Sequence, residues 1–363
     1  MRIDIFTCAV AFIFSAIIIA LTIRISLKTG VLDQPNHRSS HVKPTPRLGG
    51  VGILTGSAAG LIFFVISSGL PLGQFPLTLI LMLAAAALVG LIDDLFNLPV
   101  IIRMPIYILF AGLIGKYAAS IDKIELPGLP TLGIGLVGGL IFSTLFIAWY
   151  TNLFNFMDGI DGISGATAIV TLSAFSIVFF SHGNDILGIL NLTIVSATCA
   201  FLIFNFPPAR TFMGDIGSIF LGMSIGSFTL ITISQGYLSM PAALLFITPF
   251  AFDATFTLFR RLFARNPVWE AHHEHIYQQL CDLNVDANIV LIAYIGAAFI
   301  FSLFGLLYDR LPSYIQVSSW WFALILLTLF SISIIAIKQS RQKESRQPDI
   351  QGLPTSEANQ SGI

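Results

Sequence analysis

The chain has 363 residues, of which 55% are apolar and only 10% charged, with a formal net charge of −1 and a mean hydropathy of +0.86. Soluble chains carry about 25% charged residues, so this composition excludes a single water-soluble domain and indicates that the chain is embedded in lipid. The nearly balanced charge does not indicate a particular partner, and we expect that the protein does not bind nucleic acid.

Eleven apolar stretches are long enough to cross the hydrocarbon core, which takes roughly 20 helical residues. They cover residues 5–27, 49–69, 75–92, 101–120, 134–151, 163–181, 187–205, 218–235, 239–258, 288–308 and 319–337. Their unbroken apolar runs favour helices over a β-barrel, whose strands would alternate with period two. We predict an all-α, polytopic membrane domain over residues 1–337 and a polar, disordered cytoplasmic tail over residues 338–363.

The distribution of Lys and Arg predicts the orientation of these spans. With the N-terminus on the periplasmic side, fourteen of the 18 Lys and Arg residues fall in the loops after odd-numbered spans or in the C-terminal tail. The positive-inside rule places those loops in the cytoplasm. The acidic clusters described below all follow odd-numbered spans, so they must share this cytoplasmic face.

The first cytoplasmic loop, residues 33–50, is punctuated by prolines and contains three bases, Arg38, Lys43 and Arg47. These bases are suited to phosphate groups, Arg through its planar fork. The positive-inside bias alone would also place bases here, so both interpretations stay open.

The third span ends in two adjacent acids, Asp93 and Asp94. Neighbouring carboxylates at a membrane surface repel each other, and negative charge is unfavourable at a helix C-terminus. We therefore expect a compensating positive group, either a basic side chain or a bound cation. The alternative is an interfacial acid pair that only marks the end of the span.

After the fifth span, polar side chains recur at every third position, at Asn152, Asn155, Asp158 and Asp161. This spacing makes consecutive members near neighbours on a helical or 3₁₀ path. Gly159 and Gly162 within the motif let the backbone approach a ligand closely. Helix capping alone explains this pattern poorly, so these residues are candidates for chemistry.

Asp215 lies in the loop after the seventh span, just before the chain enters the membrane again. It belongs to the stretch of residues 213–218, Met-Gly-Asp-Ile-Gly-Ser. Asp215 or Ser218 as a helix N-cap is the structural alternative, and the same helix N-terminus would suit an anion. Five carboxylates on one face without Cys ligands favour a hard divalent cation such as Mg²⁺, with Mn²⁺ as an alternative. Such acids would repel phosphate without the metal, so metal and phosphate are implied together.

The loop after the ninth span contains His272, His273 and His275. If the stretch from Trp269 to Leu280 is helical, it has an apolar stripe that would lie on the membrane while His272 and His275 face the acids. A zinc site is an alternative, but the spacing is not His-Glu-x-x-His and further ligands are not evident. Exposed surface histidines are the simplest alternative.

Together these segments resemble the polyprenyl-phosphate N-acetylhexosamine-1-phosphate transferases, the glycosyltransferase 4 family, which start lipid-linked O-antigen and peptidoglycan precursors. The resemblance spans residues 33–280 in the family's order and rests on residues 44–50, 93–94, 152–162, 205–218 and the histidine loop. It implies ten or eleven helices in the bacterial inner membrane with a cytoplasmic active site. It also implies transfer of a sugar 1-phosphate from a UDP-N-acetylhexosamine to undecaprenyl phosphate, with release of UMP, and it is compatible with a homodimer surrounded by membrane lipid.

The resemblance also implies roles for the acids. Asp215 looks like the Mg²⁺ ligand, and Asp158 and Asp161 look like catalytic or metal-supporting acids. Asp93 and Asp94 look like the acids that serve the lipid phosphate.

Binding roles follow in the same way. Phe212 would stack on uracil with Asn205 nearby, and His272 and His275 would bind the phosphates of the nucleotide sugar. The full set of residues to which the resemblance gives substrate binding is Asn152, Asn155, Asn205, Phe212, Arg38, Lys43 and Arg47.

Two departures distinguish the chain from the peptidoglycan branch of the family. That branch carries a run of adjacent histidines, whereas here His-His-Glu-His leads into Ile-Tyr-Gln-Gln, and the first loop also differs. Both departures favour the O-antigen-initiating branch, while no residue distinguishes GlcNAc from its 6-deoxy relatives.

Two other functions fit the sequence less well. A transporter or lipid flippase would place ionisable groups near the bilayer midplane, and only Asp253 lies well inside a span. A metal-dependent lipid phosphatase would release inorganic phosphate and need no nucleotide.

Overall fold

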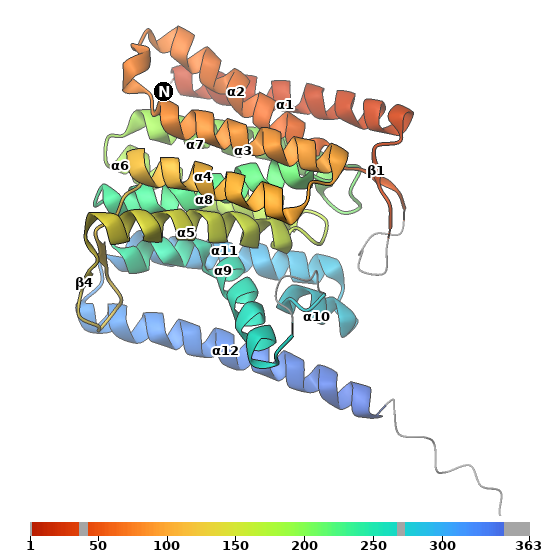
Figure 1. Cartoon of the computed structure of the whole chain (residues 1–363), viewed down its shortest axis with the longest axis vertical. Coiled ribbons are helices and arrows are strands. Elements are labelled where there is room, and N and C mark those ends of the chain that lie inside the picture. The colour runs from red at the N-terminus through yellow and green to blue at the C-terminus, as the bar shows by residue number, and fades with distance from the viewer. Residues whose placement is uncertain (1, 36–42, 267–272, 345–363) are drawn as a thin grey trace, which may run out of the picture.

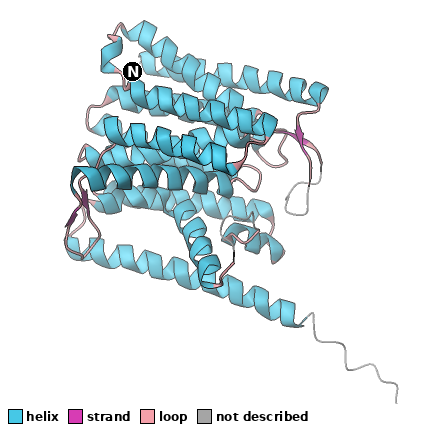
Figure 2. Ribbon diagram, in the orientation of Figure 1, coloured by secondary structure: helices cyan, strands magenta, loops and turns pink. Residues whose placement is uncertain are grey.

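The computed structural model describes residues 2–35, 43–266 and 273–344 and shows an almost entirely helical chain (Figures 1 and 2). The helices in the described residues are α1 (Arg2–Thr29), α2 (Gly49–Ser68), α3 (Leu77–Phe96), α4 (Val100–Tyr117), α5 (Gly135–Met157), α6 (Ile163–Ser181), α7 (Asp185–Asn205), α8 (Gly214–Ser234), α9 (Met240–Phe263), α10 (Ile276–Asp282), α11 (Ala287–Tyr308) and α12 (Ser313–Glu344). A 3₁₀-helix, η1 (Leu72–Gln74), precedes α3. Two antiparallel pairs complete the structure: β1 (Leu32–Asp33) with β2 (Thr45–Pro46), and β3 (Lys123–Ile124) with β4 (Leu132–Gly133).

Eleven of these helices, all but α10, are long and apolar enough to cross a membrane. This confirms the predicted all-α, polytopic architecture, while the orientation in the membrane stays a prediction. At the site, α3 continues to Phe96 rather than ending at residue 92, α5 continues to Met157 rather than ending at 151, and α8 begins at Gly214 rather than at 218. Polar residues at these ends hydrogen-bond within the protein, so the helices extend beyond their apolar stretches.

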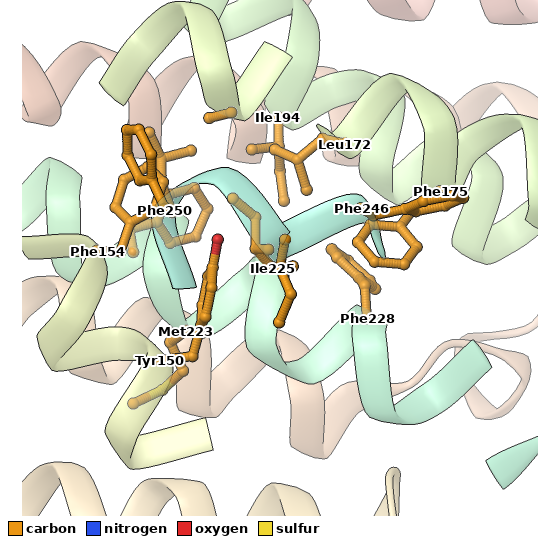
Figure 3. Close-up of a cluster of buried hydrophobic side chains, with 14 of the residues drawn as sticks. Tyr150, Phe154, Leu172, Phe175, Ile194, Met223, Ile225, Phe228, Phe246 and Phe250 are labelled. Carbon is orange, nitrogen blue, oxygen red and sulfur yellow. The ribbon is translucent and has the colours of Figure 1, made fainter. Parts of the chain in front are cut away.

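Helix α8 forms the centre of the bundle, and 94% of its apolar, membrane-spanning stretch is buried. It is rich in Gly and Ser, and such small residues allow close helix packing where lipid gives no hydrophobic drive for association. Side chains of α5, α6, α7 and α9 surround Met223 and Ile225 of α8 (Figure 3). Aromatic pairs tie these helices together, with ring centroids 5.4 Å apart for Phe154–Phe250 and 4.9 Å apart for Phe175–Phe246.

The two ends of the bundle differ. The β1–β2 hairpin and α10 lie at one end, and the β3–β4 hairpin lies at the other (Figure 1). Because successive spans are antiparallel, the C-terminal ends of α3, α5 and α7 and the start of α8 all lie at the end that carries β1. The segments predicted to form the site therefore reach one end of the molecule.

Helix α12 lies apart from the main layers, and α9 leans from the bundle toward it (Figure 1). It continues to Glu344 instead of ending at residue 337, so the predicted tail begins later than expected. Lys338 Nζ lies 2.6 Å from Asp282 Oδ2, and Arg341 donates to the carbonyl of Leu283 at 3.2 Å. These contacts hold the polar end of the helix against α10. Residues 345–363, where disorder was predicted, lie outside the described residues.

Candidate active site

A cavity of about 310 Å³ lies at the β1 end of the bundle and is lined mainly by polar residues. Its lining residues are Asp33, Arg47, Asp94, Asn155, Asp158, Gly159, Ile160, Asp161, Asn205, Phe212, Gly214, Asp215 and Ser218. They come from the first loop, the ends of α3, α5 and α7, the loop 158–162 and the start of α8. Segments far apart in the sequence thus converge, as their positions after odd-numbered spans predicted.

A second compartment of about 280 Å³ lies beside the first and shares Arg47, Asp94 and Asp215 with it. It is completed by Asp93, Asn97, Leu98 and Arg103. We call the first the larger cavity and the second the arginine compartment. Asp215 lines both, so it stands where the two spaces meet.

Asp94 closes the N-terminus of α8 from the neighbouring helix α3. Its Oδ1 accepts a hydrogen bond from the amide of Asp215 and its Oδ2 from the amide of Ile216, both at 3.0 Å. Gly214 has a φ of +66°, and a Cβ there would lie 2.5 Å from Asp94 Oδ2, so this position requires glycine. Both carboxylate oxygens satisfy amides that have no partner within α8. Its predicted role toward the lipid phosphate stays a prediction.

Arg103 supplies the positive group that the acid pair was expected to need. Its Nη1 contacts Asp93 Oδ2 and lies 3.1 Å from Asp215 Oδ2. The amide of Leu98 donates to Asp93 Oδ1 at 2.6 Å. Sequence reasoning missed Arg103 as a site residue. The available signal was its position: an arginine in the first turn of the apolar helix α4, directly after the acid pair.

Asn155 connects α5 to α8. Its Nδ2 donates to Asp215 Oδ1 and lies within hydrogen-bonding distance of Ser218 Oγ, both at 2.8 Å. Asp215 is therefore held between an amide on one oxygen and a guanidinium on the other. Asn152 is half-buried on the same helix and does not line the larger cavity. Neither Asp215 nor Ser218 is the N-cap residue of α8, which is Met213.

Two polar side chains hold the loop 158–162 against the turn 206–212. Asp161 Oδ2 accepts a hydrogen bond from the amide of Ala209 at 2.8 Å. Asn205 Oδ1 accepts from the amide of Gly162 at 2.9 Å, and its Nδ2 donates to the carbonyl of Thr211 at 2.9 Å. Asp161 and Asn205 line the cavity while they fix the shape of its wall.

Asp158 lies at the end of α5, outside the spanning helices, and lines the larger cavity. Burial raises the pKa of its carboxyl to about 7. The neighbouring Ser164 hydroxyl lowers this pKa, and the negative charges of Asp215 and Asp161 raise it further. A carboxyl whose pKa lies near neutrality is suited to exchange a proton at physiological pH.

The first loop fixes the backbone of Phe212. The amide of Phe212 donates to the carbonyl of Pro46 at 2.8 Å, and the amide of Gly49 donates to the carbonyl of Phe212 at 2.9 Å. Its side chain lines the larger cavity together with Arg47, whose Nη2 contacts the carbonyl of Asp94. Lys43 is exposed and lines neither space, and Arg38 lies outside the described residues.

The histidine loop does not present His275 to the cavity. His275 is 3% exposed, its Nδ1 lies 3.4 Å from Asp253 Oδ1, and its ring stacks on Tyr277. His273 is half-buried with its Nδ1 3.8 Å from Asp282 Oδ1, and His272 lies outside the described residues. Within the described residues the helix begins only at Ile276, and His275 lies behind the cavity wall because Asp253 binds this segment. Its predicted contact with phosphates stays a prediction.

The oxygen donors of the larger cavity fit a hard divalent cation. Among residues 2–35, 43–266 and 273–344, no group of three or more His, Cys, Asp or Glu side chains is arranged to hold a metal ion alone. Mg²⁺ usually takes one or two protein carboxylates and fills its remaining positions with water and phosphate. Asp215, with Asp158 and Asp161 on the same cavity, offers oxygens of this kind. The site suits a cation that substrate phosphate completes.

Comparison with known proteins agrees with these features. The sequence model of glycosyl transferase family 4 matches residues 76–233 of the chain. A probable undecaprenyl-phosphate N-acetylglucosaminyl 1-phosphate transferase of Bacillus subtilis is 31% identical over 302 residues, covering 81% of this chain and 83% of that protein. An undecaprenyl-phosphate alpha-N-acetylglucosaminyl 1-phosphate transferase of Yersinia pestis is 25% identical over 87% of this chain and 88% of its own. A decaprenyl-phosphate N-acetylglucosaminephosphotransferase of Mycobacterium tuberculosis is 25% identical over 74% and 73% of the two chains. The chain belongs to the polyprenyl-phosphate N-acetylhexosamine-1-phosphate transferase family.

Proposed function

We propose that the protein transfers an N-acetylhexosamine 1-phosphate, of GlcNAc or a 6-deoxy relative, from a UDP-sugar to undecaprenyl phosphate and releases UMP. The observation that carries this proposal is the position of Asp215, which lines both the larger cavity and the arginine compartment. Two adjoining polar spaces at one end of a membrane bundle suit two phosphorylated substrates, one of them anchored in lipid. The names of the relatives from B. subtilis and Y. pestis support the same transfer.

The larger cavity is the proposed donor site. Phe212 offers an aromatic face for the uracil ring, and Asp158 and Asp161 lie on the same wall. Asp215 would hold Mg²⁺ with one of these carboxylates in support. When bound, Mg²⁺ offsets the negative charge of the donor diphosphate.

The arginine compartment is the proposed site of the lipid phosphate. Arg47 and Arg103 line it, and both can pair with phosphate oxygens through a planar fork. Asp93, which Arg103 contacts, would accept a proton from the incoming lipid phosphate. In this arrangement the two substrates would meet at the shared wall of the two spaces, which is formed by Arg47, Asp94 and Asp215.

The reaction transfers a sugar 1-phosphate from a diphosphate donor to a monophosphate acceptor. An oxygen of the lipid phosphate attacks the β-phosphorus of the UDP-sugar, a new phosphoanhydride forms, and the bond to UMP breaks. The C1–O bond of the sugar is untouched, so its anomeric configuration is kept. One phosphoanhydride replaces another, so the reaction needs no ATP and is reversible.

The proposed role is the first membrane step of O-antigen or related surface polysaccharide synthesis, on the cytoplasmic face of a bacterial inner membrane. The sequence departures in the histidine loop and the first loop support this branch of the family. The acid inside α9 does not favour a transporter, because Asp253 accepts hydrogen bonds from the amides of Ile276 and Tyr277 and from the hydroxyl of Tyr294.

Release of UMP by the purified protein in detergent tests the proposal. The assay contains undecaprenyl phosphate, Mg²⁺ and one of a panel of UDP-N-acetylhexosamines, and each component is omitted in turn. UMP that forms only with lipid, metal and one donor together supports the transferase and identifies the sugar. Inorganic phosphate without nucleotide would instead indicate a lipid phosphatase, and no turnover with any donor would count against the proposal.

A further inference from the structure

A buried network joins α9, α10 and α11 behind the larger cavity. Its centre is Asp253, which is 2% exposed. Asp253 Oδ1 accepts a hydrogen bond from the amide of Ile276 at 2.8 Å, and Oδ2 accepts from the amide of Tyr277 at 3.2 Å. The hydroxyl of Tyr294 also donates to Oδ2, and Thr257 lies one turn along α9 with its Oγ1 3.4 Å from Oδ1. Asp253 thus fixes where α10 begins and where Tyr277 lies.

Tyr277 carries this network to the cavity wall. Its side chain is fully buried, and its hydroxyl lies 3.5 Å from the carbonyl oxygen of Phe156. A Cβ added at Gly159 would overlap the Tyr277 hydroxyl and lie 2.9 Å from ring atom Cζ. The ring of Tyr277 meets that of Tyr294 edge-on, with centroids 6.3 Å apart and an angle of 85° between the planes. Tyr277 is therefore wedged between α11 and the segment that carries Asp158.

Two hydrogen bonds hold the far end of the loop 158–162. The amide of Ala209 binds Asp161, and Asn205 binds the amide of Gly162. The near end leaves the helical conformation at Asp158, with φ −83° and ψ 59°. There the contact with Tyr277 at Gly159 supports the backbone from behind the cavity.

We propose that Tyr277 is a positioning residue that holds the backbone beside Asp158 in place, and that Asp253 keeps Tyr277 against it. The inference rests on the proposed transfer reaction, in which Asp158 belongs to the donor site. The segment that carries the histidines then also acts on the site through Tyr277, which lies two residues after His275. Burial and the charges of Asp253 and Asp158 raise the pKa of the Tyr277 hydroxyl well above its usual range, so it stays neutral beside these acids.

A double-mutant cycle between Gly159 and Tyr277 tests this proposal. The four proteins are wild type, Gly159→Ala, Tyr277→Ala and the double variant, with Tyr277→Phe as the conservative change. The three atoms nearest to the added methyl all belong to Tyr277, namely its hydroxyl oxygen and two ring carbons, so removal of this side chain makes room for the methyl. We expect Gly159→Ala to lower kcat about 100-fold, and the double variant to recover to the level of Tyr277→Ala, about 10-fold below wild type.

The kinetic constants separate positioning from general damage. Tyr277→Ala should lower kcat while the donor KM stays within about threefold, since the binding surfaces of the cavity are retained. Tyr277→Phe keeps the ring against Gly159 and should recover most of kcat. Tyr308→Phe is the matched control, because Tyr308 is also buried and its hydroxyl donates to the carbonyl of Gln316 at 3.0 Å, at the opposite end of α11. It should leave both constants unchanged.

Melting temperatures of the same four proteins test the contact without turnover. A double variant more stable than Gly159→Ala alone supports the wedge, whereas additive losses in both Tm and kcat would overturn the proposal. Equal loss of kcat and rise of KM in Tyr277→Ala would also overturn it, because that pattern indicates a loosened protein. A wild-type protein that releases no UMP would count against the proposed function, and the Tm cycle would still decide whether Tyr277 supports Gly159.

Discussion

Two aspartates of this chain make the same hydrogen bonds in different surroundings. Asp94 from α3 accepts the amides of Asp215 and Ile216 at the start of α8, and Asp253 from α9 accepts the amides of Ile276 and Tyr277 at the start of α10. In each case one helix supplies the carboxylate that closes the N-terminus of another.

The difference lies in what each cap holds. The first fixes Asp215 in a polar cavity beside Arg103, and the second fixes Tyr277 in a closed aromatic cluster. A buried, hydrogen-bonded acid is therefore not itself a sign of catalysis. The neighbouring space and charges decide whether the residue that it positions acts on a substrate or on the scaffold.

The largest effect is expected at the residue that the first cap presents. Asp215→Asn keeps the size of the side chain but removes the charge that would hold a cation. We expect turnover to fall by about 1,000-fold or more while membrane insertion is kept. UMP release measures turnover, and the yield of folded protein in detergent measures membrane insertion. Substantial Mg²⁺-dependent turnover by this variant would remove Asp215 as the ligand.

Arg103 should show the next largest effect. Arg103→Met leaves Asp93 and Asp215 without their shared partner and removes a base from the arginine compartment, so we expect kcat to fall about 100-fold. Arg103→Lys retains the charge and should recover part of this loss, although it lacks the planar fork. A rise in donor KM with unchanged kcat would place Arg103 at the donor instead.

Asp158 should make stability depend on pH. Its pKa is about 7 in the folded protein against an ordinary value of 3.8, so the folded state binds this proton more tightly than the unfolded chain. The contribution is complete below about pH 4 and is lost as the pH rises through about 7. We expect the metal-free protein to lose at most about 2–3 kcal/mol of stability between pH 5 and 8.

Asp158→Asn is the control for this titration, because the amide cannot ionise. The pH profile of its melting temperature should be flatter than that of wild type over the same interval. Parallel profiles for the two proteins would show that other groups cause the dependence.

Phe212→Ala should act on one substrate only. Loss of the ring from the larger cavity should raise the donor KM about tenfold, the size expected for one aromatic stack, with little change in the KM for undecaprenyl phosphate. Steady-state kinetics with each substrate varied in turn measures both constants. Equal changes would argue against stacking on uracil.

The smallest kinetic effect is expected in the second region. His275→Ala removes a buried ring that packs on Tyr277, so it should lower the melting temperature and leave the donor KM within about twofold. A tenfold rise in donor KM would mean that His275 reaches the nucleotide, and the contrast between the two caps would fail.

The sequence predicted most of the fold because its main signal, apolar length, is local. All eleven spans were found this way, and the polar end of α12 that lies beyond residue 337 contacts Asp282 and Leu283 through Lys338 and Arg341. The convergence of Asp94, Asp158 and Asp215 could also be predicted, because all three follow odd-numbered spans and therefore lie at the same membrane face.

What the sequence could not predict depends on side-chain direction. Arg103 looked like any cytoplasmic base until its guanidinium was seen between two acids. The burial of His275 beside Asp253 could not be read from the sequence, because it depends on how α9 packs on α10. The support of Gly159 by Tyr277 joins residues from separate helices that share no pattern.

The burial of α8 on nearly all sides has a consequence for how such enzymes diversify. Asp215 is part of the most buried spanning helix among the described residues, so the phosphate-transfer chemistry proposed for it would be hard to alter by gradual substitution. Phe212 precedes that helix and is tied to the first loop through the carbonyl of Pro46. Changes in that loop would reshape the proposed donor site without repacking α8, so sugar preference would evolve while the proposed reaction stays the same.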